Sequence, residues 1–136
     1  MTEHRFPEPD VMMTQILVVS DLDRSRSWWV DVLGAGLYRD YGGTSAVLSF
    51  AGTWILLVTG GPPTADKPTI TFAPPSADDR VSHAMTLRVA NCQATYDALV
   101  ARGASFLTPP HDWGAEIRAF LRDPDGHLVE LSQAIS

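Results

Sequence analysis

The sequence contains a single cysteine, Cys92, and no apolar run long enough to cross a bilayer. One cysteine excludes an intrachain disulfide framework and a zinc cluster made of several thiolates. Basic residues are also few, because 10 Lys and Arg face 16 Asp and Glu, for a formal net charge of -6. Since phosphate binding needs clustered cations, this balance argues against a nucleic-acid partner. The N-terminus lacks the charged-then-apolar pattern of a secretion signal, so we expect a cytoplasmic protein with no membrane partner.

The length of the chain fits one domain. Its 136 residues, 45% of them hydrophobic, suffice for one ordinary core, and we expect a single domain over 1–136. A stretch rich in Gly and Pro divides this domain into two similar halves. Module one spans 13–60, the connector spans 61–81 and module two spans 82–134.

Both modules show the same order of patterns, namely one strand, one helix and three further strands. In module one, Asp21 or Asp23 caps the predicted helix and Gly34 ends it. In module two, Asn91 is the cap and Gly103 the end, about seventy residues later. The chain is therefore expected to be an α+β fold of two βαβββ modules. Because one helix covers only one face of its sheet, the modules are expected to form a curved mixed sheet with a concave ligand groove.

Two motifs near the ends of this repeat, VVSDLDRSRSWWVDVLG and DPDGHLVELS, resemble those of the vicinal oxygen chelate superfamily. This superfamily includes glyoxalase I, bleomycin resistance proteins, fosfomycin resistance enzymes and extradiol dioxygenases. The resemblance covers nearly all of 14–133. It implies two βαβββ modules, dimerisation and substrate binding on the concave sheet surface. In the enzymes of the superfamily it also implies a divalent metal held by residues from four strands.

The resemblance places the four metal-ligand positions on this sequence. They fall on Thr14, on Leu56 or Leu57, on Ala84 and on Glu130. Only Glu130 carries a side chain that suits a metal, because leucine and alanine offer no donor and threonine is a poor one. We therefore expect no metal cofactor. The alternative is a divalent metal such as Zn, Ni, Mn or Fe, held by His83 and Glu130.

Alternation along the strands predicts which side chains reach the groove. Within 83–89, the apolar residues share a face with His83, and this face is expected to lie under the helix. His83 would then point away from the groove unless a bulge shifts the register. Glu130 falls on the groove face of the last strand, where it would accept a hydrogen bond from a ligand or from Arg88.

Aromatic and aliphatic side chains supply the predicted ligand surface. Trp54 and Trp113 are candidates because their rings offer a large contact area with specific geometry. The other expected ligand-binding residues are Ile16, Val18, Leu56, Leu57 and Arg88.

Two functions remain open at this point. The first is a metal-independent protein that binds an apolar or aromatic drug or metabolite, as bleomycin resistance proteins do. The second is a lyase, isomerase or dioxygenase in which Glu130 is the catalytic base or a metal ligand. In either case we expect a small-molecule ligand and a homodimer, because each module leaves one sheet face uncovered. The sequence does not decide whether the groove forms within one chain or across the dimer.

Overall fold

The structure is a computed structural model that describes residues 5–135. Module one forms β1 (Thr14–Val19), α1 (Leu22–Asp31), β2 (Gly36–Tyr41), β3 (Ser45–Phe50) and β4 (Thr53–Thr59). Module two forms β5 (Met85–Arg88), α2 (Cys92–Ala101), β6 (Ser105–Phe106), β7 (His111–Asp112), β8 (Glu116–Arg122) and β9 (Leu128–Ala134). The expected α+β repeat is confirmed. In module two, β6 has only two residues and β7 is an additional strand.

The two sheets share one topology. The first has the strand order β1-β4-β3-β2, and the second has the order β5-β9-β8-β6, with β7 also paired to β8. In each sheet the first strand pairs in parallel with the last strand of its module, whereas the other pairs are antiparallel. This places β1 and β5 at sheet edges.

Local capping signals set the helix bounds. Asp21 caps α1 by accepting a hydrogen bond from the backbone N–H of Arg24 at 3.1 Å, so Asp23 is not the cap. Asn91 caps α2 in the same way. Gly34 and Gly103 follow the two helices with φ of 79° and 97°, a left-handed conformation that favours glycine.

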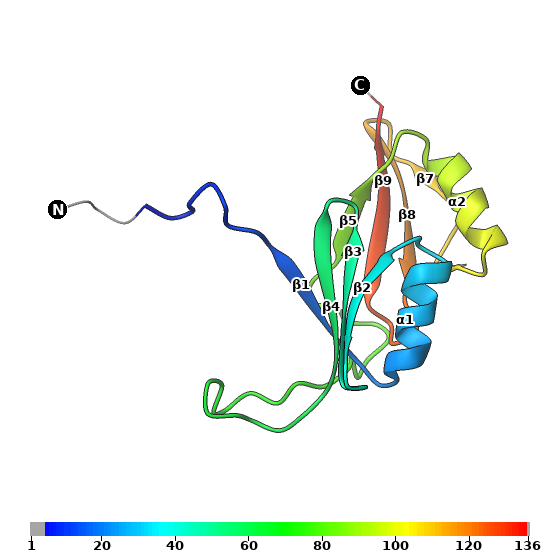
Figure 1. Cartoon of the computed structure of the whole chain (residues 1–136). Coiled ribbons are helices and arrows are strands. Elements are labelled where there is room, and N and C mark those ends of the chain that lie inside the picture. Colours follow the sequence, from blue (N-terminus) through cyan, green and yellow to red (C-terminus); the bar gives the residue numbers. More distant parts are fainter. Residues whose placement is uncertain (1–4, 136) are drawn as a thin grey trace.

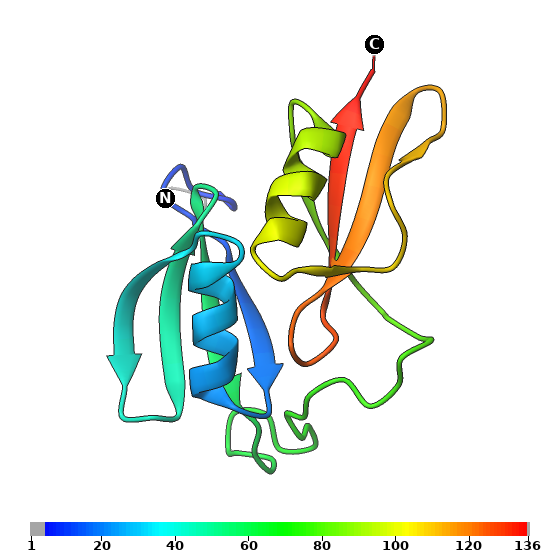
Figure 2. The same cartoon turned by 90° about the vertical axis from the view of Figure 1, so that its right-hand side faces the viewer.

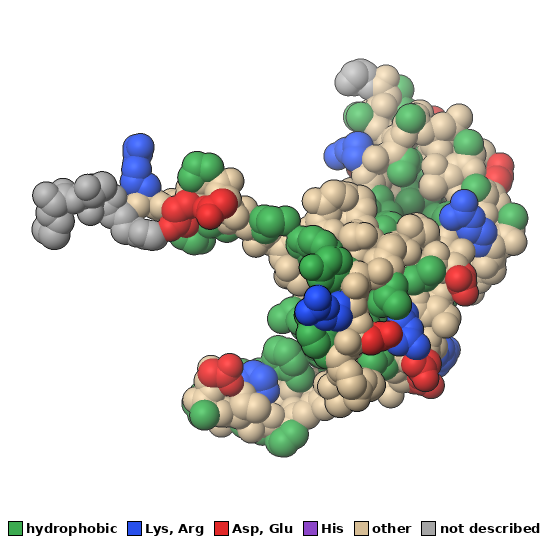
Figure 3. Space-filling model, viewed as in Figure 1, with side chains coloured by type: hydrophobic (Ala, Val, Ile, Leu, Met, Phe, Trp, Pro, Cys, Tyr) green, Lys and Arg blue, Asp and Glu red, His purple; other side chains and the backbone are tan. Residues whose placement is uncertain are grey.

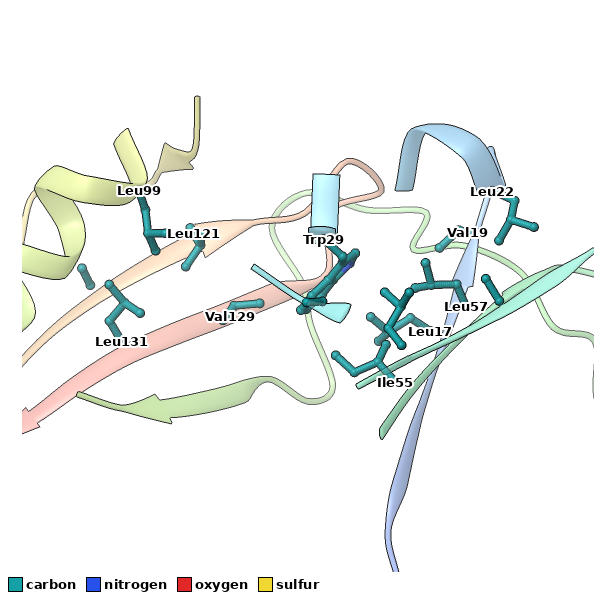
Figure 4. Close-up of a cluster of buried hydrophobic side chains, with 14 of the residues drawn as sticks. Leu17, Val19, Leu22, Trp29, Ile55, Leu57, Leu99, Leu121, Val129 and Leu131 are labelled. Atoms are coloured by element: carbon teal, nitrogen blue, oxygen red, sulfur yellow. The ribbon is translucent and has the colours of Figure 1, made fainter. Parts of the chain in front are cut away.

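The core lies between the helices and the sheets. Its fully buried side chains are Leu17, Trp29, Ala46, Leu48, Leu57, Cys92, Leu121, Val129 and Leu131. Figure 4 shows Trp29 between the apolar group of module one and that of module two. Leu57 pairs with Leu17 on the helix-facing side of the sheet. The prediction that Leu57 lines the groove is therefore wrong, because alternation directs its side chain into the core.

The modules lie side by side, with α1 and α2 on the same side of the sheets (Figures 1 and 2). The curved sheet surface does not close. We call the side away from both helices the open face; it carries Ile16 and Leu56 in module one, and Thr86 and Glu130 in module two. None of the helices within residues 5–135 is long and apolar enough to span a membrane.

The turn between β8 and β9, residues 123–127, joins the two modules; we call it the junction turn. The indole nitrogen of Trp29 donates to Asp123, and Nε2 of His127 lies 2.8 Å from the carbonyl oxygen of Val18. Asp125 accepts hydrogen bonds from the backbone N–H and the hydroxyl of Ser20. Burial raises the pKa of Asp123.

The connector contains no named strand and projects beyond the open face. Its first part forms a closed loop, because Gly61 and Phe72 exchange two backbone hydrogen bonds of 2.9 and 3.0 Å. Farther along, the carbonyl oxygen of Asp78 accepts a hydrogen bond from Arg122 on β8. Residues 5–13 project from the same side, and the surface is hollowed between these two projections (Figures 1 and 3).

Candidate functional site

An apolar hollow of about 460 Å³ lies on the open face of module one. It is lined by Thr14, Ile16, Tyr38, Tyr41, Val47, Trp54 and Leu56. The register of β1 with β4 pairs Ile16 with Leu56 and Thr14 with Trp54, so these predicted positions share one surface. Aromatic and branched side chains exposed together in a concavity offer a contact surface for an apolar ligand.

The aromatic part of this hollow includes two tyrosines that the sequence did not single out. The rings of Tyr38 and Trp54 meet edge to face with centroids 5.1 Å apart. Although both residues belong to a sheet strand, Tyr38 is 61% exposed and Tyr41 is 46% exposed. Residues three apart point to opposite faces of a regular strand, but the pairing of β2 with β3 shifts between Leu37 and Arg39. This bulge brings both tyrosines to one face, and simple alternation gives no sign of it.

A second hollow, of about 660 Å³, lies where the modules meet and is walled on one side by the connector. Ile16 and Val18 of β1, Leu128 of β9, and residues 75–77 and 80–83 contribute to its lining. Ile16 lines both hollows, so they adjoin along β1. Together they form what we call the β1 trough.

His83 lies in this second hollow, and the expectation that it points away from the groove is wrong. Strand β5 begins only at Met85, so strict alternation does not extend back to His83. The side-chain amide nitrogen of Gln15 lies 3.2 Å from Nε2 of His83 and ties the segment before β5 to the edge strand β1.

Glu130 faces the open side of module two, as the strand pattern predicts. Its carboxylate accepts a hydrogen bond of 2.7 Å from the hydroxyl of Thr86, its direct partner across β5 and β9. Nε of Arg118 lies 3.9 Å from the other carboxylate oxygen. The side chain of Glu130 is only 13% exposed. It is therefore a largely enclosed acid with two polar partners, rather than a base in apolar surroundings.

Arg88 does not contact Glu130, so that part of the prediction is wrong. Its guanidinium donates to the hydroxyl of Ser132 at 2.8 Å and lies 3.7 Å from Glu116. The hydroxyl of Ser132 also donates to Glu116, and this hydrogen bond, aided by Arg118, lowers the pKa of the Glu116 carboxyl. Two acids and two arginines thus balance one another across the open face of module two.

Trp113 lies at the edge of this charged group. Its ring is 5.2 Å from the guanidinium carbon of Arg118 and 4.3 Å from the ring of His111. The predicted aromatic residues therefore separate: Trp54 lines the β1 trough, whereas Trp113 stacks on the polar face of module two.

The residues at the expected metal positions do not fit a divalent metal. Thr14 and Leu56 belong to the apolar hollow, and Glu130 is held by Thr86 and Arg118. Sites for Zn, Ni, Mn or Fe need at least three converging donors. Within residues 5–135, no group of three or more His, Cys, Asp and Glu side chains is placed to hold a metal ion.

Comparison of the sequence with known protein families gives evidence on its relatives that does not depend on the structure. The model described as "Glyoxalase/Bleomycin resistance protein/Dioxygenase superfamily" matches residues 11–131. A curated relative, the glutathione transferase FosA of Serratia marcescens, is 28% identical over 115 residues, which are 85% of this chain and 74% of the relative.

Solved structures show the same fold. A glyoxalase/bleomycin resistance protein/dioxygenase from Nocardioides is similar with a TM-score of 0.74 and 21% identity, over 95% of this chain and 86% of the other. TnmS3, an antibiotic binding protein from Streptomyces sp. CB03234, is similar with a TM-score of 0.69 and 20% identity. That match covers 97% of this chain and 100% of TnmS3.

Proposed function

Because the chain belongs to the glyoxalase/bleomycin resistance protein/dioxygenase superfamily, we propose that it binds an apolar or aromatic small molecule without a metal. The observation that carries this proposal is the hollow of β1 to β4, where aromatic and aliphatic side chains lie exposed around Trp54. The likeness of the fold to an antibiotic binding protein supports sequestration of a drug or metabolite as the role.

The dimensions of the hollow suit this purpose. At about 460 Å³ it falls within the size range of small-molecule sites, which is roughly 300 to 1,000 Å³. Tyr38 and Trp54 stand edge to face, so a planar ligand would gain contact area and ring interactions with both. The ligand would be held mainly by the burial of apolar surface, at about 25 cal/mol for each Å² removed from water.

A catalytic role for Glu130 is the alternative, as the base of a lyase, isomerase or dioxygenase. Its oxygen atoms already have Thr86 and Arg118 as partners, and a proton taken by Glu130 would weaken both contacts. Metal chemistry would lack ligands at Thr14 and Leu56. These two observations support binding over catalysis as the proposed function.

A homodimer and a cytoplasmic location are part of the same proposal. Strand β2 lies at a sheet edge with all six of its residues exposed, which is a surface suited to a second copy. The apolar side chains of Val11, Met12 and Met13 are also exposed on the segment before β1. A partner that covered them would narrow the β1 trough.

A ligand screen tests the proposal, with two tryptophan variants as a matched pair. Bleomycin, fosfomycin and a set of planar aromatic compounds are added, and the melting temperature and tryptophan fluorescence are measured. We expect a stabilising aromatic compound, strong loss of its binding in Trp54→Ala, and retention in Trp113→Ala. If no compound stabilises the protein, or if Trp54→Ala binds every hit like wild type, the proposal fails. Consumption of fosfomycin in the presence of glutathione would instead favour the enzymatic alternative.

A further inference from the structure

The β1 trough carries positive charge at its margins and no negative charge on the open face of its module-one strands. Along the open face of β1 to β4, the register places Thr, Ile, Val, Leu, Ser and aromatic side chains together with one arginine, Arg39, and no Asp or Glu. The guanidinium of Arg39 lies over the rings of Tyr38 and Tyr41, at 5.8 and 5.9 Å. In a chain with a net charge of -6, a face free of acids is a local exception.

The junction end of the trough adds Arg80 and His83 from the end of the connector and the segment before β5. Among residues 5–135, the guanidinium of Arg80 has no hydrogen bond or ion pair, although Asp78 and Asp79 precede it directly. Neither of these acids lines the hollow. Arg80 is therefore a cation beside an apolar cavity with its donors unused.

We propose that the ligand of this trough is an aromatic or apolar organic anion, whose acidic group binds Arg80 while its apolar body lies along Ile16 toward Trp54. The inference rests on the proposed binding function and adds to it the chemical class of the ligand. Ile16 lines both hollows, so one molecule reaches from the aromatic residues to the connector.

Arginine suits this role because its planar fork of N–H donors matches the oxygens of a carboxylate, sulfonate or phosphate. His83 lies in the same lining and supplies a second polar contact. With Gln15 donating to Nε2, an uncharged His83 carries its proton on Nδ1 and keeps one donor for the ligand. The connector thereby determines specificity, whereas the sheet provides most of the contact area.

Two dyes with one aromatic skeleton provide the test. Anilinonaphthalene sulfonate (ANS) is an anion, and N-phenylnaphthylamine is its uncharged parent; both gain fluorescence in apolar sites. We expect ANS to bind wild type roughly tenfold more tightly than N-phenylnaphthylamine, which is the gain of one charge-assisted contact. We expect Arg80→Gln to remove this preference while its melting temperature and its affinity for the uncharged dye stay unchanged.

Arg24→Gln is the matched control, because Arg24 is an exposed arginine on α1, on the other side of the sheets. This variant should bind both dyes with the affinity of wild type. Trp54→Ala should lower the affinity for both dyes, which would show that they bind in the trough. Equal affinities for the two dyes, or a sulfonate preference that survives Arg80→Gln, would overturn the inference and leave the binding function standing. If neither dye binds in a manner that depends on Trp54, the proposed function fails and the inference fails with it.

Discussion

The indole nitrogen of Trp29 donates a hydrogen bond of 3.3 Å to the carboxylate of Asp123, which joins α1 of module one to the junction turn of module two. Asp123 is 4% exposed, and its other oxygen accepts from the backbone N–H groups of Asp125 and His127. One buried carboxylate thus organises the turn and anchors it to the neighbouring module.

Burial raises the pKa of Asp123 in the folded protein above the ordinary value of 3.8. The folded state then binds this proton at a higher pH than the unfolded chain does. The corresponding stability is present at acid pH and is lost as the pH rises above 3.8 through the raised pKa. We expect the free energy of unfolding of wild type, minus that of Asp123→Asn, to be larger at about pH 4 than at about pH 7.

Denaturant titrations of both proteins at each pH measure this difference. Asp31→Asn, which removes an exposed carboxylate of α1, is the control and should show no such trend. A difference that is constant, or that grows toward neutral pH, would contradict the assignment.

Adjacent leucines on β4 should behave in opposite ways. Leu57 is fully buried, so Leu57→Ala should lower the free energy of unfolding by about 2 to 5 kcal/mol through lost burial and a cavity. Leu56 is half-buried in the open hollow, so Leu56→Ala should lower the free energy of unfolding by less than about 1.5 kcal/mol. Its main effect should be weaker binding of aromatic ligands. Chemical denaturation and ligand titration of the two variants provide the measurement. Loss of binding in a stable, folded Leu57→Ala would contradict the placement.

Glu130→Gln separates binding from catalysis. The amide oxygen can still accept from Thr86, and only the partly exposed ion pair with Arg118 is lost. We expect a loss in stability of at most about 1 kcal/mol and a change in ligand affinity below about threefold. Isothermal titration with a hit from the ligand screen measures the affinity. A turnover activity that falls by roughly a hundredfold or more in this variant would establish the enzymatic alternative.

Added metals should not stabilise the protein. Tight binding to the folded state raises the melting temperature as the metal concentration exceeds its dissociation constant. With Thr14 and Leu56 at the expected ligand positions, we expect no shift with Zn, Ni, Mn or Fe, and no stoichiometric metal in elemental analysis of the purified protein. Elemental analysis that finds close to one metal ion per chain would contradict the proposal that the ligand binds without a metal. Its loss in both His83→Ala and Glu130→Gln would then identify the site.

Sedimentation at micromolar concentration should give twice the chain mass of 14.8 kDa, as a homodimer requires. Leu37 is a half-exposed apolar residue on the edge strand β2, and Leu37→Lys should shift the mass toward the monomer because a charge blocks edge association. Val100→Lys, on the exposed side of α2, is the control and should leave the dimer intact. Monomeric wild type would refute the expectation.

The sequence predicts features that depend on neighbouring residues in the chain. The helix bounds follow from Asp21, Gly34, Asn91 and Gly103, because caps and left-handed stops act within one turn. The long strands follow from runs of apolar and β-branched residues. Strand β6, one of the three strands expected after the second helix, has only two residues. Strand β7 also has two residues and exists through its pairing with β8, so no local run predicts it.

The candidate site is predictable only where alternation decides it. Glu130 and Ile16 lie on the open face as expected, because the strand period is two. The partner of Glu130 was missed, since Arg118 comes from β8, and a single sequence does not state which strand lies beside β9. His83 was misplaced because the start of β5 is set by its pairing with β9 rather than by composition.

The paired backbone of Gly61 and Phe72 makes the connector a loop with a closed neck. A side chain at Gly60 would place its Cβ 2.3 Å from the carbonyl oxygen of Phe72, so the neck also needs a glycine there. The neck fixes both ends of residues 62–71, and the free energy of closing a loop rises only slowly with its length. Foreign sequence is therefore best inserted within 62–71. A reporter domain placed there would belong to the same connector as Arg80, so the chain is a scaffold for a biosensor that reports occupancy of the trough.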